Sequence, residues 1–489
     1  MSDRSPTPPL TQITGGVAGM TATYAAVRAL ADRFDAAGDR MRGWAATGGR
    51  TLSDPDLLAS APLSPVTFAD TEERVLAATA GPHGILAASL LLEADALLVR
   101  ATVDAFVGCD QLVASSFEVL DHAAGRTLGC AVATAAPYAV ALGVVAVPAW
   151  RLTWRGLPAD TRQRLRDEAG DEGDAAQEWV DTHPEAVQHL VDGSGGLLYG
   201  LLTGLPVGGP ALLGLAAFHP TVGAAASDLA GWYGPEGEPH VRPRPDLSVR
   251  LGTVPPGDLP GLMHHLAETD DLSPRDRPGD QGTIEVQTLT ASDGSVRHVV
   301  YLPGTDDLTT TPFSQDGDVR DLPTNLRLIA GHDTTYAAGI EEAMGRAGIG
   351  PHEPVLLVGH SQGGMEAATI LAHGSAFHIT HVVTAGAPTA QVHDLPVGSH
   401  VLSLENRGDV VPLLDGHDNP DSREQVTVQF DDHETSIEAN HAMRHYVHGA
   451  AAIQASTDPS VREQLASLRE HGFLGSDATA TSQVLQITR

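Results

Sequence analysis

The stretch VLLVGHSQGG, residues 355–364, decides the fold of the C-terminal half of the chain. Four apolar residues precede a Gly-x-Ser-x-Gly turn centred on Ser361, and a helix-like segment then continues to His373. This order of strand, tight turn and helix is typical of a nucleophile elbow, which presents a serine hydroxyl at the end of a sheet. The glycines fit this geometry because side chains in their place would collide with the strained turn. We therefore predict that Ser361 is a nucleophile.

The residues around this turn predict a mostly parallel α/β sheet. From about residue 282 onward, short apolar strands alternate with helical segments. Ser292-Asp293-Gly294 separates the first two strands and indicates a hairpin. A polar helix over 458–472 and a Ser/Thr-rich tail are expected at the end of the chain. The expected strands are 283–289, 297–302, 355–358, 380–384, 401–404 and 426–430, and the expected helices are 325–347, 364–373 and 442–455.

A nucleophilic serine needs a histidine base and an acid that orients this histidine. In α/β proteins with such an elbow, both follow the serine at the ends of later strands. Asp409 follows the expected strand 401–404 in a glycine-preceded loop, from which a carboxylate can reach an imidazole. We predict Asp409 as the acid, with Glu405 and Asp415 as alternatives in the same segment.

The base must come from the histidines that follow the last expected strand, which are His433, His441, His445 and His448. It normally projects from the loop just before the final helix. His441 occupies that boundary, whereas His445 lies inside the helix. We predict His441 as the base and keep His445 as the alternative. The spacing of these histidines does not indicate a metal site, because helical histidines without nearby carboxylate or thiolate ligands rarely bind metal.

The negative charge of a tetrahedral intermediate needs backbone N–H donors. One donor is expected from Gln362, directly after the serine and at the start of the helix. The other is expected from the loop after an earlier strand. Pro303-Gly304-Thr305 ends such a strand and supplies the glycine that a close approach requires. We predict the N–H of Thr305 as the second donor, with an ordinary Pro-Gly turn as the alternative.

Taken together and in this order, these motifs resemble the α/β-hydrolase superfamily, in particular the class 3-type lipases of its lipase/esterase branch. The resemblance covers residues 282–455 and departs at Pro303, where those enzymes carry arginine before Gly-Thr. It implies an ester hydrolase of lipid metabolism that forms an acyl-enzyme on small-molecule or lipid esters and needs no metal or organic cofactor. The segments that carry it are the elbow at 355–364, HVVTAGAP at 381–388, GDVVP at 408–412 and His441-x-Met443-x-x-Tyr446.

The same residues leave other functions open. A thioesterase or an amidase uses the same Ser–Asp–His machinery. A protein of a different class would carry an inactive hydrolase fold and act in interaction or secretion through its helical half. The intact order of Ser361, Asp409 and His441 favours the enzyme, because drift readily erases one member of an unused triad.

The composition of the chain excludes several classes of function. Its 489 residues include 62 acidic and 29 basic side chains, and the net charge of -33 repels nucleic acid and anionic membrane surfaces. The 29 basic residues are all arginine, so Schiff-base and P-loop lysines are excluded. Two cysteines make neither a disulfide framework nor a metal cluster. The lysine-free, Ala/Gly/Arg-rich composition is similar to that of actinobacterial proteins.

The N-terminal half is predicted to be helical and carries no obvious catalytic residues. A heptad of apolar residues over 16–46 predicts a coiled-coil-like helix, and a second helical stretch over 70–121 is broken near Gly81-Pro82. We interpret these helices as a packing module or as the binding site of a protein partner. The expected domains are a helical module at 1–150, a helical and Gly/Leu-rich cap or connector at 151–250, and the α/β-hydrolase catalytic domain at 251–489.

Three segments of the connector region and its flanks need separate interpretations. Residues 128–150 are uncharged and long enough to span a bilayer, but their prolines and alanines favour a buried helical hairpin over membrane association. Residues 195–218 form either a lipid-facing cap or a buried helical pair, and the proline-rich segment 235–245 predicts a linker. The N-terminus lacks a signal-peptide pattern, so localisation stays open between the cytoplasm and export without a cleavable signal.

Overall fold

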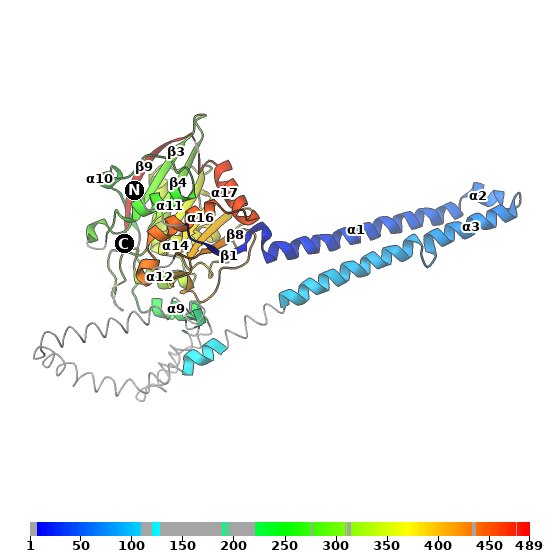
Figure 1. Ribbon diagram of the computed structural model, residues 1–489, viewed down its shortest axis with the longest axis horizontal. Helices are drawn as coiled ribbons and strands as arrows, with labels where there is room; N and C mark the ends of the chain where they lie inside the picture. Colours follow the sequence, from blue (N-terminus) through cyan, green and yellow to red (C-terminus); the bar gives the residue numbers. More distant parts are fainter. Residues whose placement is uncertain are drawn as a thin grey trace, which may run out of the picture. The chain divides into compact units, whose positions relative to one another are not determined.

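The computed structural model describes residues 7–108, 120–127, 188–189, 191–192, 194, 221–274, 277–308, 310, 314–432, 437–475 and 477–489. The chain divides into two compact units (Figure 1), one spanning Met20–Ser116 and the other combining Met1–Gly19 with Phe117–Arg489. The interpretations of 128–150 and 195–218 lie outside the described residues.

The unit that contains the C-terminus is built on one nine-stranded sheet with the order β1-β8-β7-β6-β5-β4-β3-β9-β2. Neighbouring strands from β4 to β8 pair in parallel, and the remaining pairs are antiparallel. The carboxyl ends of the parallel strands therefore lie at one edge of the sheet. The strands are β1 (Leu10–Gly15), β2 (His240–Pro243), β3 (Thr283–Thr290), β4 (Val296–Leu302), β5 (Pro354–His360), β6 (His378–Ala385), β7 (His400–Asn406), β8 (Gln425–Phe430) and β9 (Thr479–Thr488).

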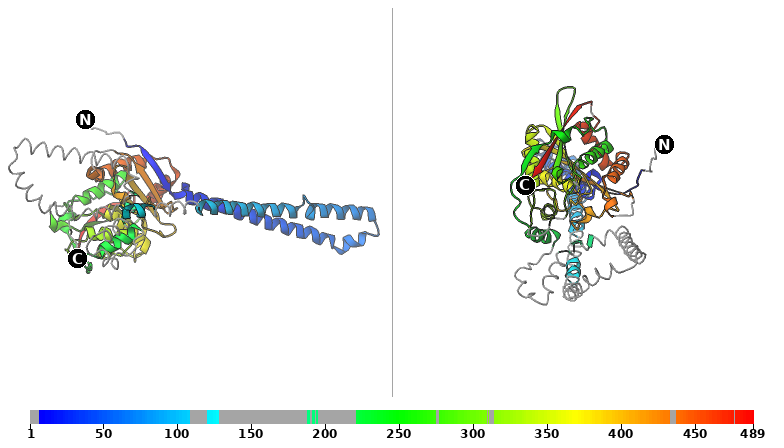
Figure 2. Two further views of the ribbon diagram at one scale, coloured as in Figure 1. Left: turned by 90° about the horizontal axis from the view of Figure 1, so that it is seen from below. Right: turned by 90° about the vertical axis from the view of Figure 1, so that its left-hand side faces the viewer.

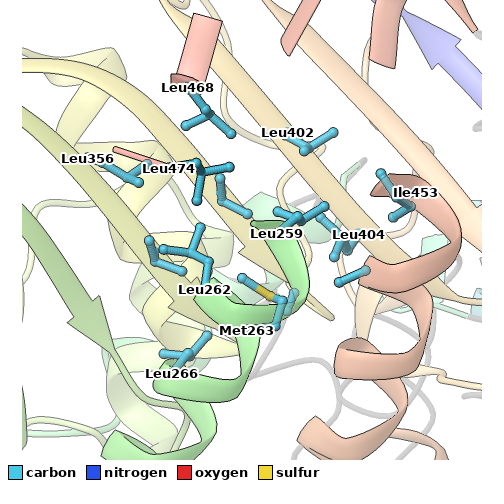
Figure 3. Packing of buried hydrophobic residues seen from close by; sticks show 14 of the residues in the cluster. Leu259, Leu262, Met263, Leu266, Leu356, Leu402, Leu404, Ile453, Leu468 and Leu474 are labelled. Atoms are coloured by element: carbon cyan, nitrogen blue, oxygen red, sulfur yellow. The ribbon is translucent and has the colours of Figure 1, made fainter. Parts of the chain in front are cut away.

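Helices cover both faces of this sheet, because successive side chains of each strand point to opposite faces. Val299 and Tyr301 of β4 join a buried cluster with α11, α16 and α17, whereas Val300 and Leu302 join one with α13 and α14. Figure 3 shows the first cluster between α11, α16 and the strands. The helices of this unit are α9 (Val222–Ala230), α10 (Pro245–Ser248), α11 (Leu259–Asp270), α12 (Leu322–Ile329), α13 (Thr335–Arg346), α14 (Gln362–His373), α15 (Ile437–Asn440), α16 (Met443–Gln454) and α17 (Pro459–Glu470).

The expected α/β sheet is confirmed, including the hairpin at Ser292-Asp293-Gly294 between β3 and β4. The expected helix over 325–347 is wrong in one respect, because it is two helices, α12 and α13. Gly331 takes a φ of 71° just after α12, and the Thr334 side chain accepts a hydrogen bond from the N–H of Ala337 to cap α13. A left-handed glycine followed by a threonine cap ends one helix and starts another.

The prediction of a Ser/Thr-rich terminal tail is wrong. Residues Thr479–Thr488 form β9, an interior strand that pairs with β3 on one side and β2 on the other. Its buried side chains include Val484, Leu485 and Ile487. The polar residues that suggested a tail include Gln486, which is itself buried between Leu485 and Ile487, and the pairing partner β3 lies far upstream in the sequence.

Two further strands come from segments that were expected to lack them. β1 pairs with β8 at one edge of the sheet, so the N-terminal region is not all-helical as predicted. β2 falls inside the expected linker 235–245 and pairs with β9 at the opposite edge. The sheet therefore recruits residues from outside the expected catalytic domain, 251–489.

The second unit is a helical hairpin whose helices lie side by side in Figures 1 and 2. Arg100 bridges to Asp32 and Asp35 across the hairpin, at 2.6 and 2.7 Å. The helix predicted over 16–46 corresponds to α1, and the break predicted near Gly81 lies between α3 and the helix over 85–108, whereas residues 109–119 of the second predicted stretch lie outside the described residues. By length and composition alone, Pro65–Gly108 is apolar enough to cross a membrane. The helices are α1 (Met20–Leu52), α2 (Pro55–Ser60), α3 (Pro65–Ala80) and a helix over 85–108.

Candidate active site

Ser361 lies in the turn between β5 and α14, with φ 52° and ψ -122°. A non-glycine residue in such a conformation costs roughly 1–3 kcal/mol and persists only where the surroundings impose it. A Cβ on Gly359 would come within 2.2 Å of the carbonyl oxygen of Gly363, and a Cβ on Gly363 within 2.0 Å of that of Leu302. The strand, strained turn and helix that the sequence predicts are therefore all present, and the glycines are required by contact.

Asp409 and His441 are paired at the carboxyl edge of the sheet. The two atoms Asp409 Oδ2 and His441 Nδ1 lie 2.6 Å apart. The same Oδ2 accepts a hydrogen bond from the Tyr446 hydroxyl of α16, and Oδ1 accepts one from the N–H of Val411 at 2.9 Å. Asp409 is buried. A carboxylate held in this way fixes a proton on Nδ1 of the imidazole and leaves Nε2 able to accept one.

The alternative acids have other partners. The Glu405 carboxylate accepts hydrogen bonds from the side-chain amides of Asn419 and Gln429, at 2.7 and 3.1 Å. Asp415 accepts the N–H of Ala390 at 2.7 Å. Burial raises the pKa of Glu405 to about 8 and that of Asp415 to about 7. Among these three carboxyl groups, Asp409 is the one that the described part of the chain pairs with His441.

Two of the alternative bases, His445 and His448, contact a different carboxylate. His445 Nδ1 lies 2.8 Å from Asp432 Oδ2, and His448 Nδ1 lies 3.2 Å from the same oxygen. His441 instead lies between α15 and α16, at the expected boundary of the final helix. His433 lies outside the described residues.

His360, the residue before Ser361, packs against the His441 ring. The ring centroids are 4.5 Å apart and the rings are inclined by 30°. His360 Nε2 lies 3.1 Å from the backbone carbonyl oxygen of His441, so it donates its proton there. Burial, together with the neighbouring His441, lowers the pKa of His360 to about 4. His360 therefore stays neutral near neutral pH and holds the His441 backbone without competing for a proton.

The two predicted oxyanion donors lie on either side of one asparagine of α12. Asn325 Nδ2 donates to Thr305 Oγ1 at 3.0 Å, and Gln362 Nε2 donates to Asn325 Oδ1 at 2.9 Å. Gln362 is the first residue of α14, so its N–H has no acceptor within the helix. An ideal Cβ on Gly304 would lie 3.2 Å from Ser361 Cβ, which places the loop after β4 directly against the elbow.

One cavity of about 530 Å³ brings three of the five predicted residues together, because Ser361, His441 and Thr305 line it whereas Gln362 and Asp409 do not. Its volume lies within the range of roughly 300–1,000 Å³ that is typical of small-molecule sites. Asp409 contacts this cavity only indirectly, through its hydrogen bond with His441. The arrangement can therefore place a small molecule against a serine hydroxyl whose neighbouring histidine is oriented by a buried carboxylate.

Replacing Tyr446 with phenylalanine is expected to lower kcat by about tenfold, which corresponds to about 1.4 kcal/mol. The Tyr446 hydroxyl is one of three groups bonded to Asp409. With one donor fewer, the carboxylate is held less firmly and orients the imidazole less well, so kcat should fall while KM changes little. Tyr301→Phe, a buried control whose hydroxyl bonds to Gln287, should leave both kcat and KM unchanged. A wild-type kcat in Tyr446→Phe would contradict this role.

The buried Glu366 of α14 should make the free energy of unfolding of the protein depend on pH. Its side chain is fully buried, Thr334 Oγ1 donates to it at 2.5 Å, and burial raises its pKa from 4.5 to about 8. Between these two pH values the folded state retains a proton that the unfolded state has lost. The contribution of Glu366 to the free energy of unfolding is therefore fully present below pH 4.5 and is lost as the pH rises through about 8. Glu366→Gln should flatten the decline by about 1.4 kcal/mol per pH unit. Urea unfolding at several pH values across this interval measures the free energy of unfolding, with the exposed Glu470→Gln as the control. Parallel pH dependences of wild type and Glu366→Gln would refute the prediction.

Three residues of the site have roles that sequence reasoning missed. Tyr446 belongs to the His-x-Met-x-x-Tyr segment, so the sequence indicated that this residue lies near the site. The sequence did not indicate its hydrogen bond to Asp409. His360 lies inside the elbow sequence, and its stacking on His441 joins residues that are far apart in the chain. Asn325 has no local signal, because its contacts with Thr305 and Gln362 arise only when α12 packs beside α14.

Over the part of the chain that the structure describes, no group of three or more His, Cys, Asp or Glu side chains is arranged to hold a metal ion. Comparison of the chain with protein-family models, with curated proteins and with solved structures gives no match. The site must therefore be interpreted from its own geometry.

Proposed function

We propose that this protein is a serine hydrolase that cleaves carboxylic ester bonds, and that its sheet is an α/β-hydrolase fold. The observation that carries the proposal is the position of Ser361. It is held at φ 52° in an elbow, in a cavity that it shares with His441, which is paired with Asp409 at 2.6 Å. The chain order serine, acid, histidine, with the three residues after β5, after β7 and after β8, supports the same conclusion.

In the proposed reaction, Ser361 Oγ attacks the ester carbonyl carbon while His441 Nε2 takes its proton. The oxygen of the tetrahedral intermediate receives hydrogen bonds from the N–H groups of Gln362 and Thr305. The bond to the alcohol oxygen then breaks, and His441 returns the proton to the departing alcohol. Water next attacks the acyl carbon while His441 takes its proton, the bond from that carbon to Ser361 Oγ breaks, and His441 gives the proton to Oγ as the carboxylic acid leaves. Asp409 orients the imidazole and stabilises its charged form in both halves.

The test is covalent labelling with a fluorophosphonate, which reacts with activated serines. We expect one phosphonyl group on Ser361, located by peptide mass spectrometry, and no labelling of Ser361→Ala. Prior incubation with a p-nitrophenyl ester substrate should slow the labelling. Intact folded protein that neither reacts with the probe nor hydrolyses esters would favour the inactive, interaction-only alternative.

A further inference from the structure

The helix over 85–108 in the helical hairpin carries two rows of mainly apolar residues, each spaced alternately by four and three positions. The inner seam faces α1, because an ideal Cβ on Gly38 would lie 3.3 Å from the carbonyl oxygen of Ser89, and Ala96 and Val103 are buried. The outer seam is offset by two positions, which is about 200° around a helix, so it lies on the opposite side. The inner seam comprises Ile85, Ser89, Leu92, Ala96, Val99 and Val103, and the outer seam comprises Ala87, Leu91, Ala94, Leu98, Ala101 and Ala105.

The outer seam is exposed along its length. Leu91 and Leu98 are 68% and 67% exposed, and its alanines are exposed or half-buried. Leu90 and Leu97 lie beside the seam and are also exposed. A contiguous apolar surface of this kind marks an interaction site on a folded protein. The alternation of four and three residues is the pattern of a helix that packs against another helix, so the seam fits a helical partner.

The charges of the hairpin argue against a bilayer as the occupant of the outer seam. Arg28 pairs with Asp104, and Arg100 pairs with Asp32, between the same two helices. Insertion of the hairpin would bring these charged groups into hydrocarbon, which is costly. Helices that lie on a membrane surface carry Lys and Arg beside their apolar face, whereas this seam is flanked by the acidic Asp95.

The order of large and small residues in the outer seam fits a second copy of the same helix in the opposite direction. About a twofold axis near position 96, Leu91 meets the partner's Ala101, and Ala94 meets the partner's Leu98. Each leucine then lies opposite an alanine, and every layer has a similar volume. A parallel pair would place leucine on leucine and alanine on alanine, which leaves gaps at the alanine layers.

The distribution of charge favours the same direction. Most of the net charge of -33 lies outside the hairpin, and the chain enters and leaves the hairpin at one end, since its two helices are antiparallel. An antiparallel pair attaches the acidic remainders of the two chains at opposite ends of the paired helices, about 36 Å apart for 24 residues. The Debye length at physiological ionic strength is only about 8 Å, so their repulsion is screened. A parallel pair would attach them side by side.

We propose that this protein forms a twofold-symmetric, antiparallel dimer through the outer seam of the helix over 85–108, with Leu91 and Leu98 as its central contacts. Such an interface uses the same surface on both copies and therefore closes at two chains. The inference concerns the helical unit and does not rest on the proposed hydrolase function.

Sedimentation velocity of the full chain between about 1 and 100 μM tests the dimer. Wild type should shift from the mass of one chain toward that of two. Leu91→Glu/Leu98→Glu should raise the dissociation constant at least about 100-fold, because it buries carboxylates in an apolar contact. Leu63→Glu, at a position before α3 that is 86% exposed, is the matched control and should dimerise as wild type does. Circular dichroism of each sample verifies that the helices remain.

Ala94→Leu tests the direction of the two helices. In the antiparallel pair it sets two leucines against each other, so it should weaken the dimer by about tenfold through overpacking. The double variant Ala94→Leu/Leu98→Ala restores one leucine opposite one alanine and should recover the wild-type dissociation constant. In a parallel pair the single substitution would instead fill an alanine layer, so a tighter dimer in Ala94→Leu would overturn the antiparallel arrangement.

Three outcomes would overturn the proposal as a whole. The first is a wild-type chain that stays monomeric over the whole concentration range. The second is a dimer that Leu91→Glu/Leu98→Glu leaves intact, which would place the interface elsewhere. The third is a monomer that floats with phosphatidylcholine or phosphatidylglycerol vesicles and loses this binding in Leu91→Glu/Leu98→Glu, which would assign the outer seam to lipid.

Discussion

Ser361→Ala should abolish the hydrolysis of short p-nitrophenyl esters and leave the protein folded. Alanine and serine both carry a Cβ, so the substitution adds no strain at φ 52° and removes only the hydroxyl. We expect kcat to fall by roughly 10³-fold or more, because the oxyanion donors and substrate binding alone leave only about 10³–10⁴-fold acceleration over water. Steady-state kinetics with circular dichroism of the same sample measure both parts of this expectation.

Ser292→Ala is the matched control for this experiment. Ser292 lies in the turn between β3 and β4, at the start of β4 and therefore at the sheet edge opposite Ser361. This variant should retain wild-type turnover. Near-normal turnover in Ser361→Ala would end the serine-hydrolase proposal, whatever the control shows.

His441→Ala is expected to be as damaging to kcat as Ser361→Ala, and His445→Ala much milder. The two histidines are four residues apart, but His441 is paired with Asp409 and lines the cavity, whereas His445 is buried against Asp432. His445→Ala should instead lower thermal stability, since it removes the nearer of the two histidine partners of Asp432 and leaves a cavity in place of the buried ring. Parallel kcat and Tm measurements on both variants separate the roles, and a dead His445→Ala beside an active His441→Ala would reverse the assignment of the base.

Much of the candidate site could be predicted because its signals are local. Gly359, Ser361 and Gly363 form a turn whose sterics act over a few residues, and that turn is present as expected. Parallel strands end at a common edge, so the loops that follow β7 and β8 were expected to approach Ser361. The pairing of Asp409 with His441 agrees with that expectation. The catalytic roles of these residues stay predictions until they are measured.

The rest could not be predicted because it depends on partners that are distant in the sequence. Glu405 and Asp409 are both plausible acids by position, and only the packing of β8 and of the loop before it against β7 gives Glu405 its own amide partners. Asn325 lies within a segment that reads as one long helix, and only the break at Gly331 separates α12 from α13. A binding partner for the helical unit is likewise a prediction that folding of the single chain does not test.

By itself, the sequence determined the alternation of strands and helices after residue 282, the strained turn at Ser361 and the order of the polar groups that follow it. These features depend on hydrophobic period and on backbone sterics, which act between near neighbours. Only the tertiary structure decided that β1, β2 and β9 complete the sheet, and that Tyr446, His360 and Asn325 support the site. Strand pairing and side-chain contact are set by which segments the whole chain brings together, and the free energy that selects them is shared across the core rather than encoded at any one position.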